Sequence, residues 1–165
     1  MKNDAAQPEA FRVIGSVFRV ERVLKLLSKR HVLSETPLSM EEADVLMTLY
    51  GAASFGWLAA DEQGFVTVAV LKTSLTYNAV GLYRSVRLLE QAGLVEIKKS
   101  HKINAKADRR SLVVRITSTG AKAIEPVYRR YLVFCARVLR NVSVEEQRIV
   151  LRFNEMLVEN ARWNL

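Results

Sequence analysis

Residues 74–119 read SLTYNAVGLYRSVRLLEQAGLVEIKKSHKINAKADRRSLVVRITST, and their hydrophobic spacing changes from helical to alternating partway along. Asn78 is typical of a helix N-cap and Gly93 of a helix end. The apolar residues between them are separated by four and three positions, which predicts a helix with one packed face and one free face. These apolar residues are Leu82, Val86 and Leu89.

A β-hairpin is predicted directly after this helix. Residues 94–97 begin a first strand, a basic loop follows, and residues 112–116 alternate with a period of two. The alternation places Val114 and Ile116 on one side of the second strand and Val113 on the other. We therefore expect a hairpin with one buried face, in a chain that is otherwise mainly helical.

Positive charge is concentrated on the predicted helix and hairpin. Between Lys72 and Arg115 the chain has ten Lys or Arg and three Asp or Glu, a net charge of +7, whereas all 165 residues together carry +8. Such a localised excess is what a polyanion-binding site needs. It favours nucleic-acid binding over a merely solvated basic face.

The composition argues against several other classes of protein. No apolar run reaches the roughly 20 residues of a membrane span, and the N-terminus lacks the apolar core of a secretory signal. The single Cys135 is interpreted as a small buried apolar residue. His31 and His101 are the only histidines, and the chain has no zinc-ligand spacing and no glycine-rich phosphate loop, so we expect no enzyme, cofactor or metal. A cytoplasmic, nucleoid-associated protein of bacteria or archaea is expected.

Helices are predicted on both sides of this unit, at 9–30 after Pro8, 40–53, 68–72, 118–141 and 144–163. Capping boxes mark two of their starts, Ser39 with Glu42 and Ser143 with Glu146, and Thr67 and Thr117 are further caps. Residues 68–72 and the helix after Asn78 would form a helix-turn-helix through a step at 73–76. Residues 55–66 are a connection with a turn at Gln63 and Gly64. Pro126 should kink the fifth helix unless that helix begins near Ile124.

The first and last helices are more apolar than the surface of a monomer should be. We expect them to pack together as a dimer interface. The alternative is an internal bundle that covers the predicted helix and hairpin of residues 74–119, a unit in which the hairpin would form a wing. The expected organisation is one domain, residues 1–165. Within it, residues 9–35 and 120–165 form a helical dimerisation region, and residues 38–119 form a winged helix-turn-helix.

Residues 107–124, ADRRSLVVRITSTGAKAI, resemble the wing signature of the MarR (multiple antibiotic resistance regulator) family of winged-helix repressors. That signature is Asp-Arg-Arg, a strand, and then Leu-Thr-x-x-Gly opening a helix, with Ile116 at the Leu position here. RLLEQAGLVEI at 87–97 is similar to the end of the family's recognition helix, and LSMEEADVLMTL at 38–49 matches more weakly. The resemblance covers nearly the whole chain in order.

The resemblance implies a homodimer that binds double-stranded DNA, with each recognition helix in a major groove and each wing at an adjacent minor groove. It implies a sequence-specific transcriptional regulator acting as a repressor; weakly specific or architectural nucleic-acid binding is the alternative. The resemblance of the wing motif also implies that Asp108 orients a wing arginine through an ion pair. The DNA-binding residues that we expect are Asn78, Ala79, Val80, Tyr83, Arg84, Arg87, Lys98, Lys99, Lys102, Lys106, Arg109 and Arg110.

The start of the recognition helix departs from the family pattern. Residues 78–81 are poorer in hydroxyl side chains than usual, so base reading must rely on apolar contact with thymine methyls or on Tyr83 and Arg84. Gly81 inside a helix is unfavourable by about 1 kcal/mol relative to Ala. It therefore suggests a close approach of the backbone to DNA or to another helix.

A small-molecule effector is a further implication of the resemblance. Members of the family commonly bind phenolic or lipophilic anions in a crevice between the dimer helices and the winged unit. The candidates for lining such a crevice are Arg12, Arg19, His31 and Trp57. Solvated charge or packing at a helix end would explain each of them more simply.

Overall fold

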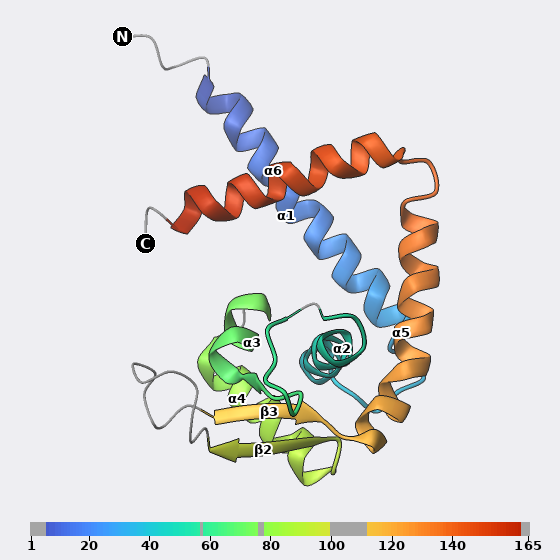
Figure 1. The fold of residues 1–165 in the computed structure, drawn as a ribbon. Coiled ribbons are helices and arrows are strands. Elements are labelled where there is room, and N and C mark those ends of the chain that lie inside the picture. Colours follow the sequence, from blue (N-terminus) through green and yellow to red (C-terminus); the bar gives the residue numbers. More distant parts are fainter. Residues whose placement is uncertain (1–5, 57, 76–77, 100–111, 163–165) are drawn as a thin grey trace. The chain divides into compact units, whose positions relative to one another are not determined.

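The computed structural model describes residues 6–56, 58–75, 78–99 and 112–162. These ranges contain six helices and three strands, so the prediction of a mainly helical chain with a small β-sheet is confirmed (Figure 1). In chain order they are α1 (Ala6–His31), α2 (Met40–Phe55), β1 (Val66–Thr67), α3 (Val68–Leu75), α4 (Ala79–Gln91), β2 (Val95–Lys99), β3 (Leu112–Ile116), α5 (Ser118–Val138) and α6 (Val144–Arg162). The chain forms two compact units, one up to Tyr131 and one from Leu132.

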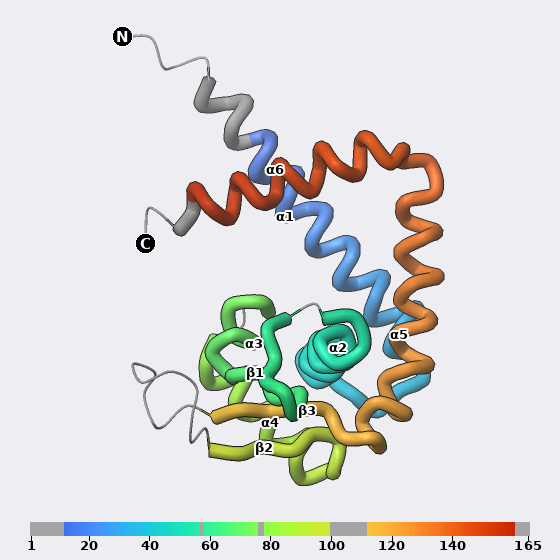
Figure 2. Tube along the Cα trace, in the orientation of Figure 1, coloured from blue at the N-terminus to red at the C-terminus, as the bar shows by residue number. Residues whose placement is uncertain are grey.

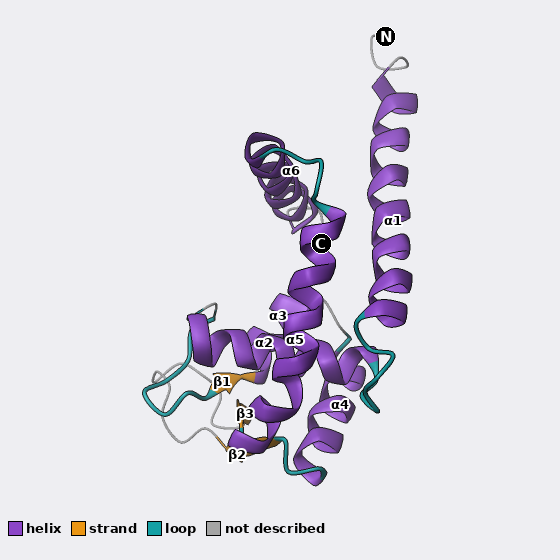
Figure 3. Cartoon of the chain, turned by 90° about the vertical axis from the view of Figure 1, so that its right-hand side faces the viewer, coloured by secondary structure: helices purple, strands orange, loops and turns teal. Residues whose placement is uncertain are grey.

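The first unit is built on a three-stranded antiparallel sheet in the order β1-β3-β2 (Figure 2). Strand β3 lies in the middle, with Val66 opposite Val114 on one side and Ile97 opposite Val114 on the other. Helix α2 packs against α3, α4 and β3, and α4 also packs against β2. The three strands lie together beside these helices (Figure 3). The sheet and α2 therefore form the support on which α4 rests.

The buried apolar core lies within the first unit. Its members fall between Val32 and Val127, and they include Val45, Leu46 and Leu49 of α2. In the described part of α1, from residue 12 to 31, and in the described side chains of α6, no residue is buried. The core thus belongs to the winged part of the chain, and the terminal helices contribute little to it.

The prediction of a hairpin with one buried face was wrong. Val113 and Val114 are adjacent in β3 and point to opposite faces, yet they are 5% and 0% exposed. A third strand, β1, was not predicted, and it pairs with the free edge of β3. Phe65 precedes β1 and is itself buried at 2% exposed, on the face that Val113 shares with Arg115. In a strand that is buried on both faces, consecutive residues are apolar, as Val113 and Val114 are.

Several predicted helix limits differ from the observed ones, among them the start of α1 and the ends of α3 and α5. Helix α1 begins at Ala6, before Pro8, because the first N–H groups of a helix lack partners and a proline there removes no bond. Helix α3 runs to Leu75, beyond the predicted end at residue 72. Helix α5 runs without interruption from Ser118 through Pro126, which excludes a start near Ile124.

The predicted caps are confirmed. Ser39 and Glu42 form a reciprocal capping box at the start of α2: the Ser39 N–H donates to Glu42 Oε2 at 2.7 Å, and the Glu42 N–H donates to Ser39 Oγ at 3.2 Å. The Thr67 hydroxyl accepts from the Val70 N–H at 3.2 Å, and so caps α3. These local bonds satisfy backbone donors that the helices cannot satisfy themselves. They explain why the helix starts could be read from the sequence.

In the second unit, the end of α5 is joined to α6 by a short turn. Ser143 and Glu146 form the second predicted capping box, with the Ser143 N–H donating to Glu146 Oε2 at 2.7 Å. This contact lowers the pKa of Glu146, because the Ser143 hydroxyl and backbone N–H both stabilise the carboxylate. Cys135 is half-buried, so its interpretation as a buried core residue was wrong.

Candidate nucleic-acid interface

Helix α4 is held on one side by apolar packing and at its ends by hydrogen bonds. Leu82, Val86 and Leu89 are each at most 1% exposed, as their spacing predicted. The Asn78 side-chain Oδ1 accepts from the Gly81 N–H at 2.7 Å, which confirms Asn78 as the N-cap. At the other end, Gly93 adopts the left-handed conformation with φ +70°, which favours glycine. Helix α4 is therefore fixed in position.

The opposite face of α4 is open to solvent. Val80 is 80% exposed and Tyr83 is 44% exposed, and Arg84 and Arg87 are exposed beside them. Arg87 is partly occupied, since its guanidinium forms an ion pair with Glu90 at 2.7 Å within the same helix. In the described ranges Arg84 forms no ion pair, so its charge is available to a ligand. The structure thus brings the predicted helix residues onto one accessible surface.

Gly81 has a local explanation. A Cβ added at this position would lie 3.3 Å from Asn78 Oδ1, and the nearest heavy atoms to it all belong to Asn78. A side chain there would crowd the oxygen that caps the helix. The suggested close approach to another helix is therefore wrong, whereas the close approach to DNA stays a prediction.

The base of the hairpin carries an ion-pair cluster that sequence reasoning missed. Glu96 on β2 accepts from Arg115 on β3, at 2.8 Å from the guanidinium Nε, and also pairs with Lys98 at 3.0 Å. Arg115 further donates to the backbone oxygen of Gln63 at 3.2 Å. The cationic ends of Lys98 and Arg115 each lie 4.6 Å from the centre of the Phe65 ring. Cross-strand register was the available signal, because Glu96 and Arg115 lie directly opposite each other.

This cluster changes the electrostatics of the hairpin base. Hydrogen bonds from Lys98 and then from Arg115 lower the pKa of Glu96, since both stabilise the carboxylate. Part of the charge counted for Lys98 and Arg115 is thereby balanced locally. Lys99, at the end of β2, is exposed and forms no ion pair in the described ranges. Of the two predicted DNA-binding residues on β2, Lys98 is paired with Glu96, whereas Lys99 has no acidic partner among the described residues.

The remaining predicted wing residues lie outside the described residues. These are Lys102, Lys106, Asp108, Arg109 and Arg110, together with the expected Asp108 ion pair. The predicted strands on either side of them are both present, as β2 and β3.

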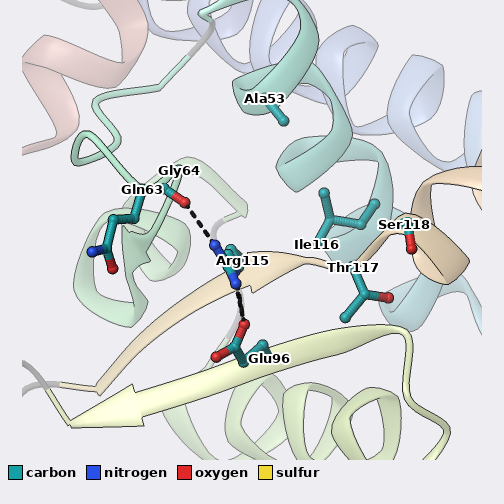
Figure 4. Close-up of a pocket in the computed structure, with 8 residues that line it drawn as sticks. All are labelled: Ala53, Gln63, Gly64, Glu96, Arg115, Ile116, Thr117 and Ser118. Carbon is teal, nitrogen blue, oxygen red and sulfur yellow. Dashed lines mark hydrogen bonds and ion pairs between the residues drawn. The ribbon is translucent and has the colours of Figure 1, made fainter.

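A pocket of about 400 Å³ lies beside the Arg115 cluster (Figure 4). In Figure 4 the Arg115 guanidinium reaches from β3 toward Glu96 on one side and the backbone of Gln63 on the other. The lining residues are Ala53, Gln63, Gly64, Glu96, Arg115, Ile116, Thr117 and Ser118. The pocket is therefore formed by the end of α2, the loop before β1 and the sheet.

Three of the four predicted effector residues lie along α1. Arg12, Arg19 and His31 are all exposed on α1, and none of them lines the pocket of Figure 4. His31 ends the helix, about 18 Å along the axis from Arg19 at 1.5 Å per residue. Trp57 lies outside the described residues.

Two further features are absent from the described ranges. No three His, Cys, Asp or Glu side chains there are grouped so that they could bind a metal ion. None of the helices in those ranges combines the length and the apolar character that crossing a lipid bilayer requires.

No protein-family model and no curated protein matches this chain. Solved structures do match. A MarR-family regulator from Neisseria meningitidis is 16% identical with a TM-score of 0.66, covering 93% of this chain and 95% of its own. MepR of S. aureus in its DNA-binding conformation is 18% identical with a TM-score of 0.67, covering 88% and 97%.

A third similar structure is BpsR of Bordetella bronchiseptica, whose DNA binding is regulated by 6-hydroxynicotinic acid. It is 13% identical, with a TM-score of 0.64, and the match covers 88% of this chain and 98% of BpsR. At such identities the likeness concerns the fold. The chain has the winged helix-turn-helix fold of MarR-family regulators over nearly its whole length, which confirms the resemblance read from residues 107–124.

Proposed function

We propose that this protein is a dimeric, sequence-specific DNA-binding transcriptional regulator that acts as a repressor. The observation that carries the proposal is the open face of α4, where Val80, Tyr83 and Arg84 are exposed on a helix whose other face is locked into the core. In a winged helix-turn-helix, the helix in this position enters the major groove. Its rigid support allows side chains to meet base edges at defined positions.

Charge supports DNA as the ligand. The stretch from residue 72 to 115 carries nearly all of the net charge of +8, and it contains α4 and both hairpin strands. Neutralisation of phosphates by Lys and Arg supplies much of the affinity of DNA-binding proteins. We assign phosphate contacts to Lys98, Lys99, Lys102 and Lys106, and minor-groove entry to Arg109 or Arg110, oriented by Asp108.

Dimerisation is supported by the surface of α1. Between residues 12 and 31 this helix exposes large apolar side chains, among them Ile14, Val20, Val23 and Leu26. Helix α6, considered separately, exposes a second apolar set that includes Ile149, Leu151 and Met156. Extended apolar surface of this kind marks a protein interface. We therefore assign both helices to a homodimer interface, which brings two copies of α4 to one duplex.

We further propose that a small aromatic or lipophilic acid relieves DNA binding. BpsR, which shares the fold, is regulated by such a molecule. Arg12 and Arg19 lie seven residues apart on α1 and therefore face the same side of the helix, where a carboxylate could bind. Absence of any effect of aromatic carboxylates on DNA affinity would remove this part of the proposal.

The deciding experiment is a fluorescence-anisotropy titration against two duplexes. One is the DNA upstream of the protein's own gene, and the other is a scrambled duplex of equal length; both are measured at about 50 mM and about 200 mM salt. A specific regulator should prefer the upstream duplex by ~10³ or more. Affinity for both duplexes should fall as salt rises.

The variant that tests the interface is Arg84→Ala. It should weaken binding to the upstream duplex at least about fivefold, because a base-edge or phosphate contact of an arginine is lost. The control is Arg129→Ala, which removes another exposed arginine, from α5, and should leave affinity unchanged. Equal affinity for both duplexes would favour the alternative, a weakly specific or architectural nucleic-acid-binding protein.

A further inference from the structure

The first turn of α4 offers few hydrogen-bonding side chains to a base. Ala79, Val80 and Gly81 have none, and the side-chain oxygen of Asn78 already accepts from the Gly81 N–H at 2.7 Å. A hydrogen bond from a base to that oxygen would compete with the helix cap. In a helix-turn-helix, however, the N-terminal residues of the recognition helix are those that reach base edges. Sequence reading at this turn must therefore use apolar contact.

Val80 is the apolar side chain suited to such a contact. At 80% exposed it is the most exposed large apolar residue in the described part of the chain. Valine is also a weaker helix former than alanine, which occupies the neighbouring position 79. Neither core packing nor helix propensity explains a valine here. A contact with a ligand would explain it, because binding removes the side chain from water.

We propose that Val80 reads the C5-methyl group of a thymine in the major groove. This inference rests on the proposed function and specifies how that site chooses its DNA. Thymine is the one base that presents a methyl group in the major groove, and apolar side chains discriminate it by contact. The protein thus selects an A·T pair, with the thymine facing α4, in each half-site.

Arg84 determines the next feature of the half-site. It follows Val80 by four residues, so both side chains lie on the same side of α4, about 6 Å apart along its axis. Successive base pairs are about 3.4 Å apart. An arginine one to two base pairs from the thymine meets the O6 and N7 acceptors of guanine, the most common specific contact of this residue. The half-site therefore contains a thymine and a guanine at this spacing.

The experiment begins with selection of a consensus from random 24-base-pair duplexes by the intact protein. Each thymine of the consensus is then replaced singly by deoxyuridine, which removes only the methyl group. At one thymine per half-site, one to two base pairs from a guanine, affinity should fall about fourfold. This value corresponds to about 0.8 kcal/mol for one buried methyl group.

A double-mutant cycle assigns that loss to Val80. In the Val80→Ala protein the same uracil substitution should have no effect, because the methyl group has lost its contact. The control is Leu88→Ala, which truncates another exposed apolar residue of α4, beyond the first turn, and should retain the fourfold preference for thymine. Circular dichroism of each variant checks that α4 is still formed.

The failure of this inference can be distinguished from that of the proposed function. A clear consensus in which no thymine-to-uracil substitution changes affinity would overturn the reading by Val80 and leave the regulator intact. A uracil effect that persists in Val80→Ala would also overturn it, because another residue would then contact the methyl group. Selection that yields no consensus would remove the proposed function, and this inference with it.

Discussion

Thr117 and Gly120 join the first turn of α5 to the end of α4. The Thr117 N–H donates to the Leu94 backbone oxygen at 3.0 Å, and its hydroxyl donates to the Gly93 oxygen at 2.8 Å. The same hydroxyl accepts from the Gly120 N–H at 3.0 Å. These are the Thr and Gly of the Leu-Thr-x-x-Gly element in the wing signature. The structure therefore supplies a physical reason for both: they hold the start of α5 against the residues that follow α4.

Gly120→Ala should lower the free energy of unfolding by about 3 kcal/mol, the upper end of the range for overpacking. A Cβ at this position would lie 2.0 Å from the Leu94 backbone oxygen, and backbone cannot move aside as a flexible side chain can. Urea denaturation followed by circular dichroism measures the change. The control is Thr119→Ala at the exposed neighbouring position, expected within about 0.5 kcal/mol of the unmodified protein. An unchanged urea midpoint for Gly120→Ala would contradict this account of the junction.

At the scale of elements, α4 combines a structural and a functional face, and Asn78 belongs to both. Its side-chain oxygen caps the helix, while its position places it beside the residues that we assign to base reading. The two roles make different demands on the side chain. A cap requires only an oxygen that can accept from the backbone, whereas adenine recognition requires the whole amide.

Asn78→Ala should lower the free energy of unfolding by about 1 kcal/mol, because the Gly81 N–H loses its acceptor. Asn78→Ser should restore most of this loss, since serine is an equally good N-cap. If capping is the main role of Asn78, the serine variant should also keep the affinity for the selected duplex. Urea denaturation measures the stability of the unmodified protein, Asn78→Ala and Asn78→Ser, and fluorescence anisotropy measures their DNA affinity. Normal stability of the serine variant with lost DNA affinity would instead show that Asn78 contacts a base.

The two-residue strand β1 changes the environment of the hairpin formed by β2 and β3. β1 has only two residues, too few for a period-two pattern to be recognised, so it was not predicted. Its pairing with β3 converts an edge strand into a central one, in which both Val113 and Val114 are buried. The Phe65 ring, placed next to β1, then lies under the cationic ends of Lys98 and Arg115. None of these contacts follows from the local sequence.

At the scale of the whole molecule, the proposed dimer rests on the exposed apolar surface of α1. We expect the chain, with a mass of 18.7 kDa, to sediment as a species of twice that mass. Val20→Glu should shift it toward the monomer, because burying a carboxylate in an apolar interface is unfavourable. The control is Lys72→Glu, which introduces the same acid at an exposed position of α3, outside the proposed interface. Sedimentation equilibrium distinguishes the two, and a Val20→Glu protein that remains dimeric would exclude this face of α1 from the interface.

Residue patterns and tertiary contacts contribute differently to the first unit. Helix starts at Ser39 and Asn78 were predictable because a cap and its helix lie within four residues of each other. The contacts of Arg130 could not be predicted in this way, because its partners are distant in the sequence. Its guanidinium donates to the Val32 oxygen at 3.1 Å and pairs with Glu35 at 2.8 Å, both more than ninety residues earlier in the chain.

The sequence by itself determined the type and order of most elements, the packed face of α4 and the basic character of the site. These properties depend on spacing and composition within one segment, where side chains meet through helical or strand geometry alone. Tertiary structure decided which charges remain available. Among the described residues Arg84 has no acidic partner, whereas Lys98 and Arg115 are balanced by Glu96, because antiparallel pairing of β2 and β3 brings that carboxylate between them. Tertiary structure also explains why residue 120 is a glycine. The Leu94 oxygen, which excludes a side chain at position 120, reaches that position only once the strands have paired.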